Sequence, residues 1–250
     1  MKVTERFSDR VENYRKYRPN YPKEIIPFLE TEIGLAPSSI ITDIGSGTGI
    51  STEMFLKNGN MVYAVEPNTQ MRLAAEKQLS SYPNFHSISA TAEATTLPDH
   101  CIDIIASFQA FHWFDARGAN VEFKRIVKPG GWIVLIWNNR LLDASPFLTA
   151  FEKLLNVFGT DYPVVQDSDI YENIKILFAE KSYELKKFSN SQSLDYEGLK
   201  GRLLSDSYIP TVADAKYHPM LEELRRIFDE YQIDHRVEIL YKTEVFYGRL

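Results

Sequence analysis

Three glycines that alternate with other residues follow a short apolar run, and they constrain this chain more than any other feature. The run spans 40–44, and the glycines are Gly45, Gly47 and Gly49. A helix-compatible segment begins directly after them, at Ile50. A strand that enters a helix through a glycine-rich turn lets backbone N–H groups approach a ligand closely. The turn therefore indicates a nucleoside-binding corner.

Short apolar runs alternate with helical patterns through the first half of the chain. This alternation predicts an α/β fold, with a parallel sheet covered by helices on both faces. The expected strands are 40–44, 61–65, 85–89, 102–108 and 132–137, and the expected helices are 50–58, 69–80 and 115–127.

The second half of the chain carries two further strand patterns, at 183–188 and 237–247, which would complete a seven-stranded sheet. The regions 141–180 and 190–235 contain amphipathic helical patterns. Ligands of open α/β sheets bind beyond the carboxyl ends of the strands. We therefore expect these regions to add helices over the ligand-binding edge.

Composition limits the partners and the compartment. The 250 residues are 44% hydrophobic, enough for one sizeable core, and the net charge of −6 disfavours nucleic acid as a partner. The first residues are too polar for a signal peptide and no apolar run reaches membrane-spanning length, so we expect a cytoplasmic protein without a membrane partner. The single cysteine, Cys101, fits a reducing compartment. No metal-ligand spacing occurs, and the oligomeric state stays open.

Two nucleoside cofactors compete for the glycine turn. A dinucleotide site prefers Gly-x-Gly-x-x-Gly, and here the third glycine comes one residue early. Asp43 suits a ligand with a cationic amino group and would be awkward against a pyrophosphate. Glu66 follows the second apolar run, where a carboxylate can hold a ribose. S-adenosyl-L-methionine (SAM) is therefore favoured. The alternatives are an NAD(P)-dependent oxidoreductase and a non-catalytic SAM-binding protein.

Four segments resemble, in order and spacing, the motifs of class I SAM-dependent methyltransferases with a methyltransferase type 11 domain. They are Asp43–Gly49, Val65–Met71, Ala90–Asp99 and Phe123–Gly131. The resemblance implies a Rossmann-like, doubly wound, seven-stranded sheet, mostly parallel with one antiparallel strand, plus helical lid additions. It implies one methyltransferase domain over 1–250. It also implies the donor SAM and the product S-adenosyl-L-homocysteine (SAH).

The same resemblance assigns roles within these motifs. Glu66 would hold both ribose hydroxyls. Asp43 would accept a hydrogen bond from the amino group of SAM, directly or through water, or would cap the turn. Thr91 stands where many class I enzymes have Asp, so the backbone N–H of Ala92 would contribute more to adenine recognition. The cofactor-binding residues expected here are Asp43, Gly45, Ser46, Gly47, Thr48, Gly49, Glu66, Pro67, Asn68, Met71, Thr91, Ala92 and Glu93.

Two more segments resemble a narrower group, the small-molecule methyltransferases related to trans-aconitate and azapteridine methyltransferases. They are Phe7–Pro22 and Gln109–Phe114. The resemblance implies that an N-terminal segment, 1–35, covers the cofactor. Tyr14 would lie near the sulfonium and Arg18 on the methionine carboxylate, and Gln109 would also contact the cofactor.

The methyl acceptor is expected to be a small molecule that receives the methyl group on O, N or S. The motif that follows the fourth strand of DNA amino-methyltransferases is absent, and the additions within 141–235 would form the substrate side. His112 is the candidate general base, because imidazole titrates near neutral pH, although a packing role is open. The substrate-binding residues expected are Phe111, Trp113, Trp137, Asn139 and Arg140.

Overall fold

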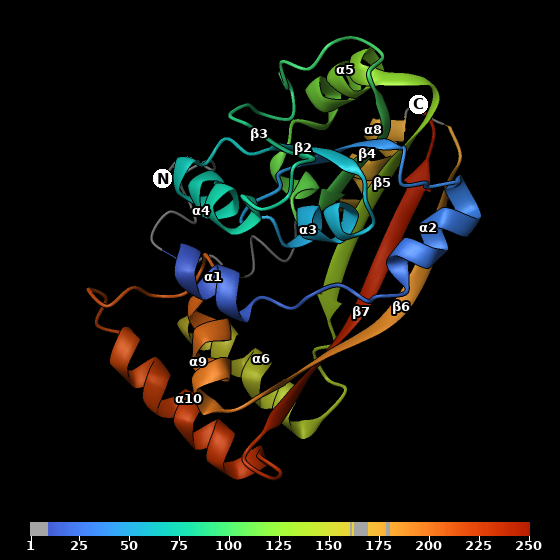
Figure 1. Ribbon diagram of the computed structural model, residues 1–250. Coiled ribbons are helices and arrows are strands. Elements are labelled where there is room, and N and C mark those ends of the chain that lie inside the picture. The colour runs from blue at the N-terminus through green and yellow to red at the C-terminus, as the bar shows by residue number, and fades with distance from the viewer. Residues whose placement is uncertain (1–9, 161, 163–169, 179–180) are drawn as a thin grey trace.

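A seven-stranded sheet lies at the centre of the computed structural model, which describes residues 10–160, 162, 170–178 and 181–250. The strand order is β3-β2-β1-β4-β5-β7-β6 (Figure 1). Within this sheet, β7 pairs antiparallel with β5 and β6, and the other pairs are parallel. The predicted fold class, a doubly wound and mostly parallel sheet with one antiparallel strand, is confirmed.

The strands follow the apolar runs of the sequence. The expected strands 40–44, 61–65 and 102–108 are confirmed to the residue. The strands are β1 (Ile40–Ile44), β2 (Met61–Val65), β3 (Phe85–Ile88), β4 (Ile102–Phe108), β5 (Val127–Arg140), β6 (Tyr183–Leu194) and β7 (Val237–Gly248).

Two strands are longer than predicted by more than one residue, because pairing with neighbours extends them past their apolar runs. In β5, Val127 already pairs with Ile102 before an irregularity, and regular pairing resumes at Trp132. The hairpin partners β6 and β7 pair over their whole length, so β6 runs on to Leu194. The prediction that 190–194 belong to helical additions is therefore wrong.

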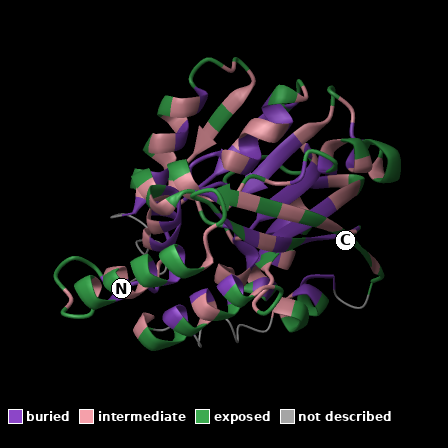
Figure 2. Cartoon of the chain, turned by 90° about the horizontal axis from the view of Figure 1, so that it is seen from below, coloured by how far each residue is buried: buried purple, intermediate pink, exposed green. Residues whose placement is uncertain are grey.

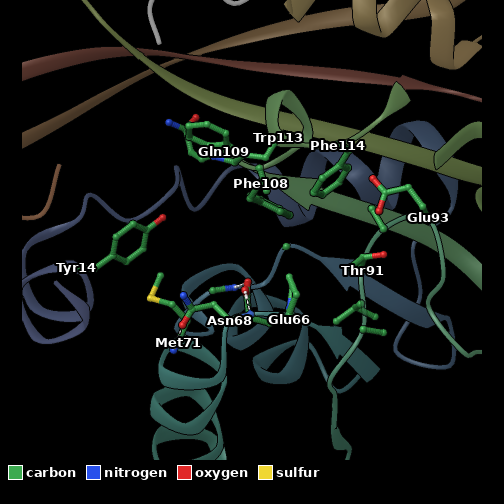
Figure 3. A pocket seen from close by; sticks show the side chains of 17 residues that line it. Tyr14, Glu66, Asn68, Met71, Thr91, Glu93, Phe108, Gln109, Trp113 and Phe114 are labelled. Carbon is green, nitrogen blue, oxygen red and sulfur yellow. Dashed lines mark hydrogen bonds between the residues drawn. The ribbon is translucent and has the colours of Figure 1, made fainter. Parts of the chain in front are cut away.

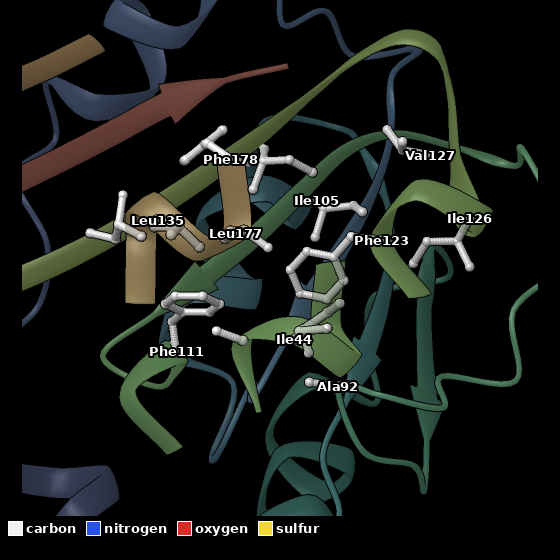
Figure 4. Close-up of a cluster of buried hydrophobic side chains, with 14 of the residues drawn as sticks. Ile44, Ala92, Ile105, Phe111, Phe123, Ile126, Val127, Leu135, Leu177 and Phe178 are labelled. Atoms are coloured by element: carbon white, nitrogen blue, oxygen red, sulfur yellow. The ribbon is translucent and has the colours of Figure 1, made fainter. Parts of the chain in front are cut away.

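Helices cover both faces of the sheet, because alternate strand residues point to opposite sides. Helices α2 (Ile25–Ile33) and α3 (Ile50–Lys57) pack on one face, in a cluster that includes Ile104 of β4. Helices α5 (Ala116–Ile126) and α8 (Ile170–Phe178) pack on the other face, where Ile105 and Leu135 join them (Figure 4). The prediction that all of 141–180 adds to the ligand edge is wrong for the buried side of α8. Its buried residues, Ile174, Leu177 and Phe178, belong to this core.

A second group of helices lies beyond the carboxyl ends of β4 and β5, where β6 and β7 extend past the rest of the sheet (Figure 1). It comprises α6 (Pro146–Phe158), α9 (Tyr196–Leu204) and α10 (Tyr217–Tyr231), which bury a core of their own. Burial in this group and in the sheet is shown from below in Figure 2. The remaining elements are α1 (Val11–Tyr17), α4 (Thr69–Leu79) and the 3-10 turn η2 (Phe111–Trp113).

Two features are absent from the described ranges, which omit 1–9 and three short internal gaps. None of their helices is both long and apolar enough to cross a bilayer. No group of three or more His, Cys, Asp or Glu side chains there is arranged to hold a metal ion.

Replacing a core residue of α5 tests this layering. Phe123 is fully buried between α5 and the sheet, whereas Val121 on the same helix is 70% exposed. Phe123→Ala should lower the free energy of unfolding by about 3–5 kcal/mol, because it removes buried area and leaves a cavity. The matched control Val121→Ala should change it by less than about 0.5 kcal/mol. Urea unfolding measures both, and equal losses would contradict the assigned packing.

Candidate functional site

The glycine turn connects β1 to α3 and brings two other loops close to itself. At Gly45, with a φ of +72°, a Cβ atom would lie 2.4 Å from the Cβ of Ala110. At Gly49, with a φ of +88°, a Cβ would lie 2.7 Å from Cδ1 of Leu79 in α4. Only glycine fits both the backbone conformation and the space at these positions. The turn is therefore packed between α4 and the loop that follows β4.

Glu66 at the end of β2 is fixed by this turn. Its Oε2 accepts a hydrogen bond from the backbone N–H of Gly47 at 2.9 Å, and its Oε1 accepts one from Asn68 at 2.8 Å. Burial raises the pKa of Glu66, and these two hydrogen bonds partly offset that rise. Each carboxylate oxygen can accept a further hydrogen bond. The side chain is thus a rigid pair of acceptors at 8% exposure.

A first cavity opens above Glu66, between the turn and the loop after β4 (Figure 3). Tyr14 and Gln109 border it on one side and Met71 on another. Its wall brings together most of the residues that the sequence assigned to the cofactor. These are Tyr14, Gly45, Gly47, Glu66, Pro67, Asn68, Met71, Thr91, Ala92, Glu93 and Gln109.

Asp43 and Gly49 do not line this cavity or the two described below. Asp43 is fully buried, and its Oδ2 accepts hydrogen bonds from the hydroxyls of Ser51 and Thr52, both at 2.7 Å. Its Oδ1 has no hydrogen-bond partner within the described part of the chain. Burial raises the pKa of Asp43 to about 6, against the pull of the two hydroxyls. The side chain thus holds the first turn of α3 from behind the glycines.

A smaller third cavity continues from the first toward α1. Arg18, Ser46 and Thr48 line it, and Tyr14, Gly45 and Gln109 contribute to its wall as well. The hydroxyl of Thr48 is buried without a hydrogen-bond partner among the described residues. The three remaining cofactor residues of the sequence prediction therefore come together here.

A second cavity lies on the other side of Gln109, toward α9. Five predicted residues that follow β4 or end β5 line it, namely His112, Trp113, Trp137, Asn139 and Arg140. Phe111 was expected to bind substrate, but it is fully buried in the α5–α8 core and lines none of the three cavities. Its neighbours in η2 turn outward, and its own ring packs edge-on against Phe114 at 5.7 Å. That expectation is wrong.

The second cavity also contains residues that sequence reasoning missed. They come from the end of α9, the segment after it and β7: Arg202, Asp206, Ser207, Tyr208 and Tyr241. The Arg–Asp spacing of four, at 202 and 206, was a signal. On a helix, however, such a pair usually lies at the surface.

Buried ion pairs hold the wall of the second cavity together. Asp206 accepts from Nη2 of Arg18 at 2.7 Å and from Nη1 of Arg202 at 3.0 Å. Burial would raise the pKa of Asp206, but Arg202, Arg18 and Arg140 together lower it. On the opposite side, Nη2 of Arg140 donates to Glu152 at 2.6 Å and to the hydroxyl of Tyr162 at 2.7 Å.

Gln109 and Tyr14 are the two residues that line all three cavities. Gln109 has a φ of +53°, an uncommon conformation for a residue other than glycine. Its N–H donates to the carbonyl of Ile136, and its Oε1 accepts from the N–H of Asn138 at 2.7 Å. These bonds hold the strained residue at the point where the three cavities meet.

Helix α1 closes the cavities from the side of α9. Besides the ion pair of Arg18, the side chain of Gln192 donates to the carbonyl of Tyr17 at 2.8 Å. The ring of Tyr17 fills the space where Gly201 lacks a side chain. The first nine residues of the expected cofactor-covering segment lie outside the described ranges.

Comparison with known proteins gives matches of three kinds. Residues 42–135 match the methyltransferase domain family. An uncharacterized methyltransferase-like protein from Schizosaccharomyces pombe is 28% identical over 247 residues, covering 96% of this chain and 93% of that protein. An uncharacterized methyltransferase from Mycobacterium tuberculosis is 34% identical over 161 residues, which are 64% of this chain and 62% of that one.

Two solved structures share the fold. A candidate type II methyltransferase from Anaeromyxobacter dehalogenans has a TM-score of 0.68 at 17% identity, over 93% of this chain and 98% of that one. A SAM-dependent methyltransferase from Aquifex aeolicus has a TM-score of 0.53 at 18% identity, over 75% and 92%. Family match, relatives and fold agree with the motifs of the glycine turn. Residues 42–135 therefore resemble a methyltransferase domain, and the described chain shares the fold of solved methyltransferases.

Proposed function

We propose that this protein transfers a methyl group from SAM to a small-molecule acceptor. One observation carries the proposal. A rigid carboxylate, Glu66, faces a cavity that meets two others at Tyr14 and Gln109. Such a junction suits a ligand with a nucleoside, a charged tail and a reactive centre between them.

The residues present fit SAM part by part. The first cavity would take the adenosine, with the free acceptor capacity of Glu66 directed to the two ribose hydroxyls. The third cavity would take the methionine part, where the unpartnered hydroxyl of Thr48 and the guanidinium of Arg18 are donors. The reactive sulfur would then lie near Tyr14 and Gln109, which border the second cavity. That cavity would hold the acceptor.

SAM supplies a methyl group on a positively charged sulfur, so the donor needs little further activation. The protein's own contribution is alignment and exclusion of water, which in well-oriented reactions is worth about 7–11 kcal/mol. Gln109 is fixed by two backbone contacts, and α1 covers the junction through its contacts with α9. Aromatic rings of Tyr14 and Trp113 beside the junction favour a cationic sulfur.

A nicotinamide-dependent oxidoreductase fits less well. Glu66 could hold a ribose of NADH. A pyrophosphate would bind on the glycine turn, however, and the acidic Asp43 lies directly behind that turn. A protein that only binds SAM would not need a cavity for a methyl acceptor, and the second cavity with its buried arginines is therefore unexplained by that alternative.

Calorimetry with SAM, SAH and NADH tests the proposal. The protein should bind SAM and SAH and not NADH. Glu66→Gln should weaken SAM binding roughly 10–100-fold, because the hydrogen bonds to the ribose lose their charge assistance and the new amide N–H would face the backbone N–H of Gly47 or Asn68. The exposed Glu30→Gln is the matched control and should bind SAM normally. Preferential binding of NADH would overturn the proposal.

Asp43→Asn should change how stability depends on pH. Because the folded protein raises the pKa of Asp43 from 3.8 to about 6, ionising it destabilises the fold as pH rises through this range. At neutral pH the cost is of order 3 kcal/mol. The variant should therefore gain stability relative to wild type at about pH 7.5 and lose that advantage near pH 4. Urea unfolding at both pH values measures the difference. A constant difference would contradict the raised pKa.

SAM binding by the same variant decides between the two roles of Asp43. A loss of about tenfold would support a hydrogen bond to the amino group of SAM. Unchanged affinity would leave only the cap on α3.

His112→Ala tests the base role. His112 lines the acceptor cavity, and its ring lies 4.6 Å from that of Trp113. For an acceptor that must lose a proton, such as a neutral amine or hydroxyl, kcat should fall about 100-fold at saturating acceptor. For an acceptor that is already anionic, kcat should not change. Equal losses for both kinds of acceptor would assign His112 to packing alone.

A further inference from the structure

The second cavity presents hydrogen-bond donors that lack acceptors. Three residues that line it each carry a buried N–H group with no hydrogen-bond partner among the described residues: Arg18 at Nε, Arg140 at Nε and Trp137 at Nε1. All three atoms can donate and none can accept. Buried donors are normally satisfied, because leaving one unpaired costs about 1–3 kcal/mol. A ligand that brings acceptor oxygens would satisfy them.

We propose that the second cavity binds a carboxylate group of the methyl acceptor, held by Arg140 and Trp137. The inference rests on the proposed function, since it assigns the acceptor's chemical class. Arg140 and Trp137 line only the second cavity, whereas Arg18 also lines the cavity assigned to the methionine part. Of the three residues with an unpartnered N–H group, Arg140 and Trp137 are therefore the two that we assign to the acceptor.

The charge of the cavity favours an anion. Three arginines line it, Arg18, Arg140 and Arg202, and Asp206 is the one carboxylate among its described lining residues. Asp206 is shared by Arg18 and Arg202, and Arg140 has its own partner in Glu152. The group as a whole retains an excess of one positive charge. Bound SAM would add a further net positive charge beside it, so a monoanionic group fits better than a neutral or cationic one.

The side chain of Arg140 is buried and held in one position, unlike that of a surface arginine. Its side chain is 9% exposed, and Glu152 and Tyr162 hold its Nη2. Its guanidinium lies over the ring of Phe151 at 5.3 Å. A planar, immobilised guanidinium recognises the two oxygens of a carboxylate and loses little side-chain entropy on binding. Trp137 is similarly fixed, at 3% exposure, between Phe111 and Phe246.

Matched acids and amides test the proposal on the protein saturated with SAH. The probes are benzoate, 4-hydroxybenzoate and succinate, with benzamide, 4-hydroxybenzamide and succinamide as their neutral counterparts and phenyl phosphate as a dianion. Calorimetry should show at least one acid binding tenfold or more tightly than its amide, which is about the value of one charge-assisted hydrogen bond. Methyl transfer from SAM to the same panel, followed as SAH release, should favour the acids.

Two variants locate the anchor. Trp137→Phe keeps an aromatic ring and removes the N–H, so it should weaken acid binding roughly 5–10-fold and amide binding by less, because an amide oxygen forms only a neutral hydrogen bond. The double variant Arg140→Gln/Glu152→Gln removes the ion pair without leaving a buried charge, and it should weaken acid binding about 100-fold. SAH binding should stay normal in both. The exposed Arg226→Gln, whose side chain is 58% exposed, is the matched control.

The outcomes separate this inference from the proposed function. If the wild-type protein binds neither SAM nor SAH, the proposed function itself is overturned. Three outcomes with normal SAM binding would overturn only the carboxylate anchor. The amides could bind as tightly as the acids, phenyl phosphate could be preferred, or no acid could bind at all. Acid binding that survives both variants would also overturn it.

Discussion

The site depends on one interaction, the pair of hydrogen bonds that Glu66 accepts from Gly47 and Asn68. These bonds connect the turn after β1 to the end of β2, so two neighbouring strands present their ends as one surface. They also leave each carboxylate oxygen with remaining capacity to accept. The same side chain thus stabilises the site before a ligand is bound and provides the contact proposed for its ribose.

A second dependence lies at the other end of the cavities. Asp206 bridges Arg18, from the segment after α1, and Arg202, from α9. Removing Asp206 would leave two buried cations unpaired, which is strongly destabilising. The ion pairs therefore hold the N-terminal helix over the junction, and they also give the acceptor side its positive charge. The packing of this region and the substrate preference that we propose depend on the same residues.

Strand and helix positions near the glycine turn were predictable, because apolar runs and glycines determine them locally. Phe111 shows where such reasoning fails. Its neighbours Trp113 and Phe114 line a cavity, and nothing in the order of these aromatic residues marks Phe111 as the one that faces the core. The same holds for β6, whose polar residues 190–193 are strand only because β7 pairs with them. For β6, pairing with a strand that is distant in the sequence determined the structure, and the local sequence pattern did not.

The sequence by itself determined the α/β order and the resemblance to methyltransferases, and it predicted the nucleoside corner with Glu66, since these rest on short motifs with fixed spacing. Only the tertiary structure decided which further side chains join the predicted ones around the second cavity, which we propose holds the acceptor. Arg202 and Asp206 lie far along the chain from the predicted Arg140, and each reads as an ordinary charged residue. Burial brings them together and leaves donors unpaired, and burial is a property of the packed chain that no local spacing encodes.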